Sequence, residues 1–431
     1  MFTRIRPLIG LIAGALLVGG AAATAFADTG VVHSTEDGVS ATAVIVKELQ
    51  MPEGTTVPAV TFTFNVTPIS SDGDTNVLPP SLFVGNTTTV VFTEGDPSTP
   101  PSGGNWIATK NSGDLFASNP WQHAGIYVYQ ITEQDMSIPF NTVHQKMYYS
   151  NAVYSLKVAV KADKTDKHLY VSWYTMVQGT VLNDNPNLDT KVASLKFTNT
   201  YIETNGPGNP DTPNPEVDSN ATLYIKKLVA LDYADETLYF DFQMSLTPPA
   251  LLKADDTPAY YRAYVVSGTS VADTTELAKN ADSSLIKTDT SGTYIMVSTT
   301  VPTNFKLKHG QKLVFIDTPV GTRYTVSETH VSPYTTKVEI RTAAGTPLEI
   351  TTDADAGTPA FDTGSQLVGS FILVENVKTF DNHALFTNSY QSVNATGLII
   401  NNLPFLGLIV LAGGALVAFV IVKSRKVRAT K

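Results

Sequence analysis

Three residue types that together could form a covalent bond recur in the same order in both halves of this chain. They are Lys47, Glu133 and Asn199, then Lys227, Glu328 and Asn388. A deprotonated lysine is a nucleophile, and a protonated glutamate can hydrogen-bond to an asparagine carbonyl and carry protons while ammonia leaves. The pattern therefore predicts an amide bond between a lysine and an asparagine inside each half.

The two lysines end similar strands, ATAVIVK at 41–47 and ATLYIKK at 221–227. Side chains alternate between the two faces of a strand, so Lys47 and Lys227 share a face with the apolar residues before them and are predicted to point into a core. Burial without a partner lowers the pKa of a lysine and raises that of a carboxyl group. A neutral amine beside a neutral acid is the expected result. Lys226 is adjacent, and only the phase of the strand favours Lys227 over it.

The glutamates and asparagines also lie in repeated elements. YQITE at 129–133 aligns with YTVSE at 324–328, and FTNTY at 197–201 aligns with FTNSY at 386–390. The strand TFTFNVTP has its counterpart in YFDFQMSLTP. The order of the elements indicates a tandem duplication of one domain rather than a solenoid, whose repeats are much shorter. A lone lysine at a strand end is usually a solvated surface residue, and repetition is what argues against that alternative here.

The lysine-led first strand, the Y-x-[IV]-x-E box and the final F-T-N-x-Y strand together resemble the isopeptide-linked pilin domains of Gram-positive bacteria, the streptococcal-type major pilin family. The resemblance covers both halves. It implies immunoglobulin-like β-sandwich domains, a Lys47–Asn199 bond assisted by Glu133, and a Lys227–Asn388 bond assisted by Glu328.

Short β-rich segments fill most of the chain between the termini, and helical periodicity is nearly absent, so we expect an all-β fold. We predict two immunoglobulin-like sandwich domains at 28–201 and 221–390, joined by a linker rich in Pro, Gly, Asn and Asp at 202–220. Residues 95–120 are expected to form a long excursion between strands.

Both ends of the chain have the features of an exported, anchored protein. Arg4 and Arg6 precede an apolar run and small residues, which predicts a signal peptide over 1–27, cleaved between Ala27 and Asp28. At the other end, 391–431 contains an apolar run at 403–422 that is long enough to span a bilayer, followed by a basic tail.

A sorting signal is predicted just before that apolar run. VNATG at 393–397 resembles the pilin-type variant of the Leu-Pro-x-Thr-Gly signal, with Ala395 in place of the proline. The resemblance implies that a sortase cuts between Thr396 and Gly397.

Composition excludes several functions. The chain has no cysteine, so it can have neither a disulfide framework nor a thiol nucleophile. Its formal net charge is −10, and removal of both terminal segments would leave 22 basic against 39 acidic residues, so nucleic acid is not an expected partner. The seven histidines include no pair at the i, i+4 spacing typical of zinc ligands. The sequence also has no Gly-rich phosphate-binding loop and no G-x-S-x-G nucleophile motif. We therefore expect no metal, no cofactor and no turnover enzyme, only single-use formation of the two amide bonds.

Two functions are consistent with these features. In the first, the chain is a structural pilus subunit that sortase joins to other pilin subunits and finally to cell-wall peptidoglycan. The acceptor lysine is then expected at Lys191 or Lys196, with Lys191 preferred because it lies in a loop region. In the second, the chain is a wall-anchored adhesin or minor pilin that binds a host or surface ligand.

Overall fold

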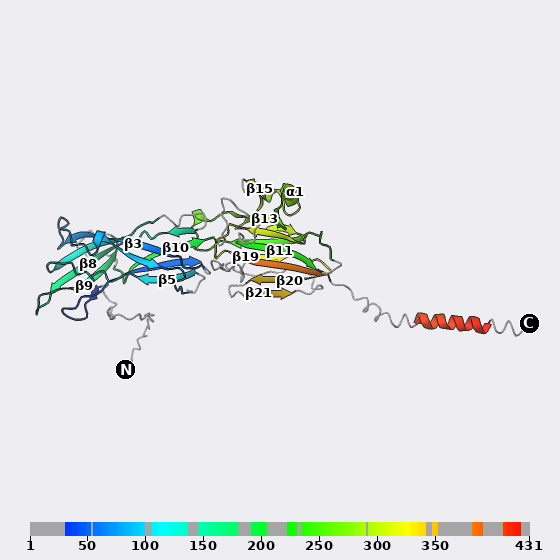
Figure 1. The fold of residues 1–431 in the computed structure, drawn as a ribbon, viewed down its shortest axis with the longest axis horizontal. Helices are drawn as coiled ribbons and strands as arrows, with labels where there is room; N and C mark the ends of the chain where they lie inside the picture. The colour runs from blue at the N-terminus through cyan, green and yellow to red at the C-terminus, as the bar shows by residue number, and fades with distance from the viewer. Residues whose placement is uncertain are drawn as a thin grey trace, which may run out of the picture. The chain divides into compact units, whose positions relative to one another are not determined.

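In each strand, the alternation of apolar and polar residues determines which side chains face the core of the domain. The computed structural model describes residues 31–52, 55–99, 105–136, 145–179, 191–204, 222–230, 234–289, 292–341, 347–351, 382–390 and 408–423. The chain divides into two compact units with a boundary between Tyr201 and Ile202, the short segments Pro52–Thr55 and Thr142–Lys146 being grouped with the second unit. Strands make up nearly all of the regular structure in both units (Figure 1).

The first unit is built from two sheets that share one apolar core. Its elements are β1 Val31–His33, β2 Ile45–Pro52, β3 Val60–Ser71, η1 Val84–Asn86, β4 Thr87–Phe92, β5 Asn105–Asn111, β6 Gly125–Glu133, β7 Gln145–Tyr148, β8 Val153–Ala162, β9 Leu169–Gln178 and β10 Leu195–Glu203. One sheet has the order β1-β9-β8-β6-β3-β4 and the other β5-β2-β10-β7. Side chains of both sheets, such as Ile45 and Phe64, belong to the same buried cluster.

The second unit repeats this plan with a longer sheet. Its elements are β11 Leu223–Ala230, β12 Phe240–Thr247, η3 Ala254–Asp256, β13 Tyr260–Ser267, β14 Ser270–Val271, α1 Thr274–Leu277, η4 Ser283–Leu285, β15 Ile286–Asp289, β16 Gly292–Ser298, β17 Thr303–Leu307, β18 Gln311–Phe315, β19 Arg323–Glu328, β20 Tyr334–Arg341, β21 Pro347–Thr351 and β22 His383–Tyr390. One sheet follows β15-β16-β13-β18-β11-β22-β20-β21, with β14 beside β13, and the other follows β17-β12-β19.

The all-β class expected from the sequence is confirmed, and most predicted strands lie where the alternation places them. Two details differ. The predicted excursion at 95–120 contains a strand, β5, which pairs with β2 at the edge of its sheet. Only Ala108 of β5 is buried, so this edge strand lacks the clear alternation that reveals a half-buried strand. The last strand of the first unit also runs on to Glu203, into the predicted linker.

The described residues include only part of the segments predicted at the two ends of the chain. The signal peptide with Ala27 and Asp28, and the sorting residues Thr396 and Gly397, lie outside the described residues. A helix covers 408–423, within the predicted membrane span at 403–422 except at its last residue. Among the described residues, no helix reaches the length and apolar character needed to cross a membrane.

Candidate functional site: two buried lysine, glutamate and asparagine triads

The strands that carry lysine and asparagine are neighbours in both units, and they run parallel. On β2 and β10, Lys47 pairs with Phe197, so Asn199 lies two residues further along on the same face. On β11 and β22, Lys227 pairs with Phe386, and Asn388 again lies two residues further along. The offset is the same in both units. Because a slip of one residue would turn every side chain to the opposite face, this shared register is what brings each lysine to its asparagine.

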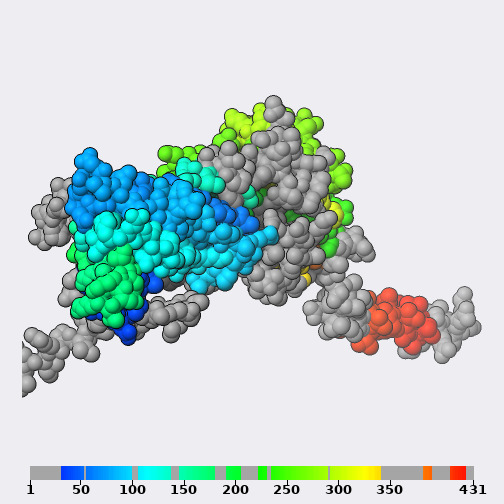
Figure 2. Space-filling model, turned by 60° about the vertical axis from the view of Figure 1, so that its left-hand side comes forward, coloured from blue at the N-terminus to red at the C-terminus, as the bar shows by residue number. Residues whose placement is uncertain are grey.

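Each glutamate comes from the facing sheet. Glu133 ends β6 and pairs with Phe64 of β3, while Glu328 ends β19 and pairs with Phe242 of β12. The triads therefore span the cores between the two sheets. This position removes them from water, and in Figure 2 the described part of the first unit, coloured blue to green, presents a closed surface of side chains on this face.

In the first unit the three side chains are in direct contact. Lys47 Nζ lies 2.9 and 2.8 Å from the two carboxylate oxygens of Glu133. Asn199 Nδ2 donates to Glu133 Oε1 at 2.6 Å. The side chains of Lys47 and Glu133 are fully buried, and so is Asn199.

The second unit has nearly the same geometry. Lys227 Nζ lies 2.9 and 2.8 Å from the oxygens of Glu328, and Asn388 Nδ2 donates to Glu328 Oε1 at 2.5 Å. All three residues are buried. The strand phase places Lys227 inside, whereas Lys226 lies on the other face and is only partly buried.

The asparagine faces its glutamate through the amide nitrogen, which differs from the carbonyl contact expected from the sequence. In the first unit the reason is visible, because the backbone N–H of Ser150 donates to Asn199 Oδ1 at 2.8 Å. A backbone N–H can only donate, so the atom facing it must be the oxygen, and Nδ2 must then point to Glu133. The glutamate thus lies next to the amide nitrogen of the asparagine.

Burial shifts both partners of each pair toward their neutral forms. Desolvation lowers the pKa of Lys47 from 10.5 to about 8, although the charge of Glu133 opposes the change. Desolvation likewise lowers the pKa of Lys227 to about 8 against the effect of Glu328. The pKa of each glutamate is raised by the same cause, against the neighbouring lysine. A neutral lysine and a protonated glutamate are the forms that nucleophilic attack and proton transfer require.

Aromatic rings close the sites from the sides. Lys47 Nζ lies 4.3 Å from the ring centroid of Phe62, and Lys227 Nζ lies 4.1 Å from that of Phe240. These phenylalanines occupy matching positions in the two aligned F-x-F segments. The sequence alignment therefore contained the signal, but only the structure shows that the rings contact the lysines and keep water away.

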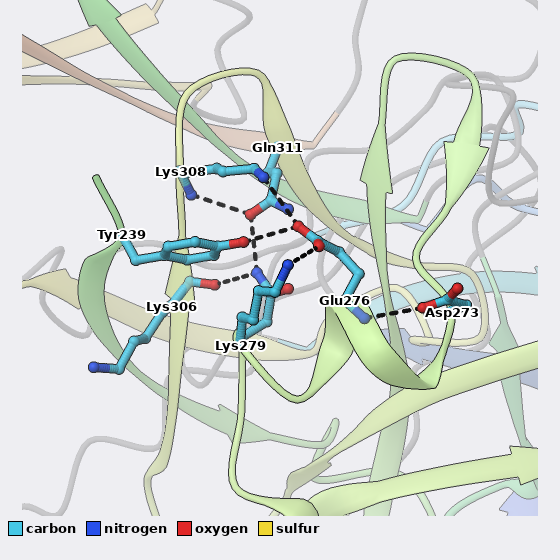
Figure 3. Close-up of polar contacts among 8 residues, drawn as sticks. Tyr239, Asp273, Glu276, Lys279, Lys306, Lys308 and Gln311 are labelled. Atoms are coloured by element: carbon cyan, nitrogen blue, oxygen red, sulfur yellow. Dashed lines mark hydrogen bonds and ion pairs between the residues drawn. The ribbon is translucent and has the colours of Figure 1, made fainter. Parts of the chain in front are cut away.

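A second polar cluster supports the backbone beside Lys227 (Figure 3). Glu276 of α1 accepts hydrogen bonds from Lys279, Lys308 and Tyr239 at 2.8, 3.0 and 2.8 Å. These contacts hold α1 to the turn between β17 and β18. In the same turn, the N–H of Gly310 donates to the carbonyl oxygen of Lys227 at 2.9 Å. The cluster was not predicted from the sequence, because Tyr239, Glu276 and Lys308 come from three separate segments of the chain.

The two lysines proposed as polymerisation acceptors have different surroundings. Lys196 lies on β10, about half exposed, and its Nζ pairs with Glu48 Oε1 at 3.1 Å. Lys191 is exposed and forms an isolated backbone bridge with Val177. Both lysines are exposed, in contrast to the buried lysine of the triad.

One group of described residues has donor atoms close enough to hold a metal. Asp163, Asp166 and His168 have ligand atoms within 4.8 Å of one another in the turn between β8 and β9. These atoms form contacts within the turn itself. Asp163 accepts a hydrogen bond from the N–H of Thr165 at 2.6 Å, and Asp166 contacts His168 at 2.5 Å. Such side-chain contacts are the ordinary role of Asp in tight turns.

Fold and site together define a class of all-β domains in which the first long strand carries a buried lysine, the last carries a buried asparagine, and a glutamate from the facing sheet contacts both. Two segments of the chain match known protein families. Residues 44–202 match the family described as Spy0128-like isopeptide containing domain. This match covers the first unit and agrees with the streptococcal-type pilin family that the sequence resembles. Residues 221–361 match a domain of unknown function, DUF7601.

Solved structures give weaker likenesses. The major pilin from Streptococcus pyogenes is 19% identical, with 81% of this chain and 99% of that chain covered and a TM-score of 0.30. The T3.2 major pilin of the same species is 16% identical, with 84% and 100% covered and a TM-score of 0.32. The pilus-presented adhesin Spy0125 (Cpa) is 14% identical, with 56% and 36% covered and a TM-score of 0.20. No curated protein matches the chain.

Proposed function

We propose that this chain is a structural subunit of a cell-wall-anchored pilus, polymerised by sortase, in which each immunoglobulin-like domain is crosslinked by its own Lys–Asn isopeptide bond. The observation that carries the proposal is the pair of buried triads, which have the same strand register and the same Nζ to carboxylate distances in both units. A buried lysine and glutamate with no further purpose would cost folding free energy, and covalent bond formation explains their retention.

The chemistry follows from the contacts. The neutral Nζ of Lys47 attacks the side-chain carbon of Asn199, and negative charge develops on Oδ1. Glu133, protonated at the start, passes its proton to Nδ2, with which it is already in contact, and its carboxylate then takes the surplus proton from Nζ. The carbon–nitrogen bond of the carboxamide breaks, ammonia leaves, and Glu133 returns to its starting protonation state. The reaction occurs once per domain, so the chain is not a turnover enzyme.

The first test is the intact mass of the ectodomain, residues 28–396, which should be lower than its sequence mass by two ammonia molecules. Glu133→Ala and Glu328→Ala should each restore one ammonia. Lys226→Ala is the matched control, because it removes a neighbouring lysine of the opposite face and should restore none. An unmodified mass for the parent ectodomain would refute the crosslinks.

Polymerisation is tested separately by immunoblots of cell-wall extracts. A ladder of high-mass species is expected for a sortase-assembled pilus exposed on the cell surface. A single band would instead indicate a wall-anchored monomer, such as an adhesin. The linkage to peptidoglycan would then still depend on Thr396, which can be tested by Thr396→Ala.

A further inference from the structure

The two triads differ at one atom, the carbonyl oxygen of the asparagine. In the first unit, Asn199 Oδ1 accepts the backbone N–H of Ser150 at 2.8 Å. In the second unit, Asn388 Oδ1 is buried and has no hydrogen-bond partner among the described residues. The other contacts of the two sites agree closely, including the lysine to glutamate distances and the distance from each lysine to its phenyl ring. Among the hydrogen bonds of the two triads, the one to the asparagine carbonyl is therefore the contact that differs.

Local backbone geometry explains the difference. Strand β7 ends at Tyr148, two residues before Ser150, so the N–H of Ser150 lies beyond the end of that strand and can turn to the asparagine side chain. In the second unit, β20 runs without interruption beside β22, and Thr336 pairs directly with Asn388. A regular strand of this kind commits its backbone groups along the ladder and does not offer an amide to the side chain.

We propose that the backbone N–H of Ser150 is an oxyanion donor for amide-bond formation in the first unit, and that the second unit, where no described residue donates to Asn388 Oδ1, forms its bond more slowly. The inference rests on the proposed isopeptide chemistry. When Lys47 Nζ attacks, the carbonyl carbon of Asn199 becomes tetrahedral and Oδ1 becomes negative. A donor already directed at Oδ1 stabilises this charge, and in a buried site such a contact is far stronger than in water.

The test follows each crosslink separately in the full chain. The chain is synthesised in a cell-free system and sampled at intervals, and tryptic peptides that contain the Lys47–Asn199 or Lys227–Asn388 bond are quantified by mass spectrometry. Each rate is measured from the time at which that domain becomes resistant to a protease pulse, which separates bond formation from folding. In the unmodified chain, the first crosslink should form faster than the second. Equal rates, or a faster second crosslink, would overturn the proposal.

Ser150→Pro removes the N–H, and removal of one oxyanion donor typically slows a reaction by about 100-fold. We expect the Lys47–Asn199 bond in this variant to form slowly but completely, with the second bond unchanged. Ser150→Ala is the matched control, because it keeps the N–H and removes only the hydroxyl that accepts from the N–H of Ala152. It should react at the rate of the unmodified chain.

Every result of this experiment bears on the inference. An unchanged rate for Ser150→Pro would overturn it. If that variant forms no first crosslink because the domain does not close, the comparison of the two domains in the unmodified chain decides the question. If neither bond forms in the unmodified chain, the isopeptide chemistry itself is refuted, which is a different outcome from two bonds that form at equal rates.

Discussion

Loss of one crosslink should destabilise one domain and spare the other. The bond in the first unit joins positions 47 and 199, which are 152 residues apart in the sequence. A crosslink lowers the conformational entropy of the unfolded chain, and the loop-length relation for disulfides gives about 5 kcal/mol for a loop of this size. For a domain of this size, 1 kcal/mol changes Tm by roughly 2–4 °C. We therefore expect Asn199→Ala to lower the Tm of the first domain by about 10–20 °C.

The assay is differential scanning calorimetry of the ectodomain, in which the two domains give separate transitions. Asn388→Ala should produce the mirror result, with the second transition lowered and the first retained. Susceptibility to trypsin should follow the same division between the domains. Equal shifts in both transitions would show that the domains do not unfold independently, and no shift at all would refute the stabilising role of the bond.

Noncovalent contacts of Asn199 must be separated from the crosslink. Its side chain donates to Glu133 and accepts from Ser150, and loss of such buried hydrogen bonds costs about 1–3 kcal/mol by itself. The control is Asn199→Ala in a Lys47→Ala background, where no bond forms in either chain and Asn199 still has Glu133 and Ser150 as partners. The difference in stability within that background measures the noncovalent part, and the remainder is due to the crosslink.

Two further predictions concern the rate of bond formation and the site of polymerisation. The rate should be bell-shaped with pH. Below the raised pKa of Glu133 the Lys47–Glu133 pair holds two protons, so the lysine is charged and cannot attack. Above about pH 8 the pair loses its last shared proton, which ammonia needs in order to leave. The assay transfers newly folded chain to buffers across this pH range and measures the rate at which ammonia is released. A rate that keeps rising well above pH 8 would contradict the proposed proton transfer. For polymerisation, mass spectrometry of digested polymer should show a branched peptide that joins Thr396 to Lys191 in preference to Lys196, whose ion pair with Glu48 restrains it. A branch at another lysine would refute this assignment without affecting the crosslinks.

The sequence by itself determined the members of both triads and the direction in which they point. Lysine, glutamate and asparagine recur in aligned segments, and the period of two in a strand predicts that Lys227 rather than Lys226 faces the core. The structure places these residues together with that phase. Local patterns contain this information because the orientation of a side chain depends only on its own strand.

Only the tertiary structure decided how the triads are completed. The parallel pairing of β2 with β10, the phenyl ring of Phe62 over Lys47, and the N–H of Ser150 at Asn199 all depend on which segments meet after the chain has folded. The Ser150 contact leaves no trace in the sequence, because every residue except proline has a backbone N–H. Its position depends on β7 ending at Tyr148, so that the N–H of Ser150 lies beyond the strand and beside Asn199 in the folded chain.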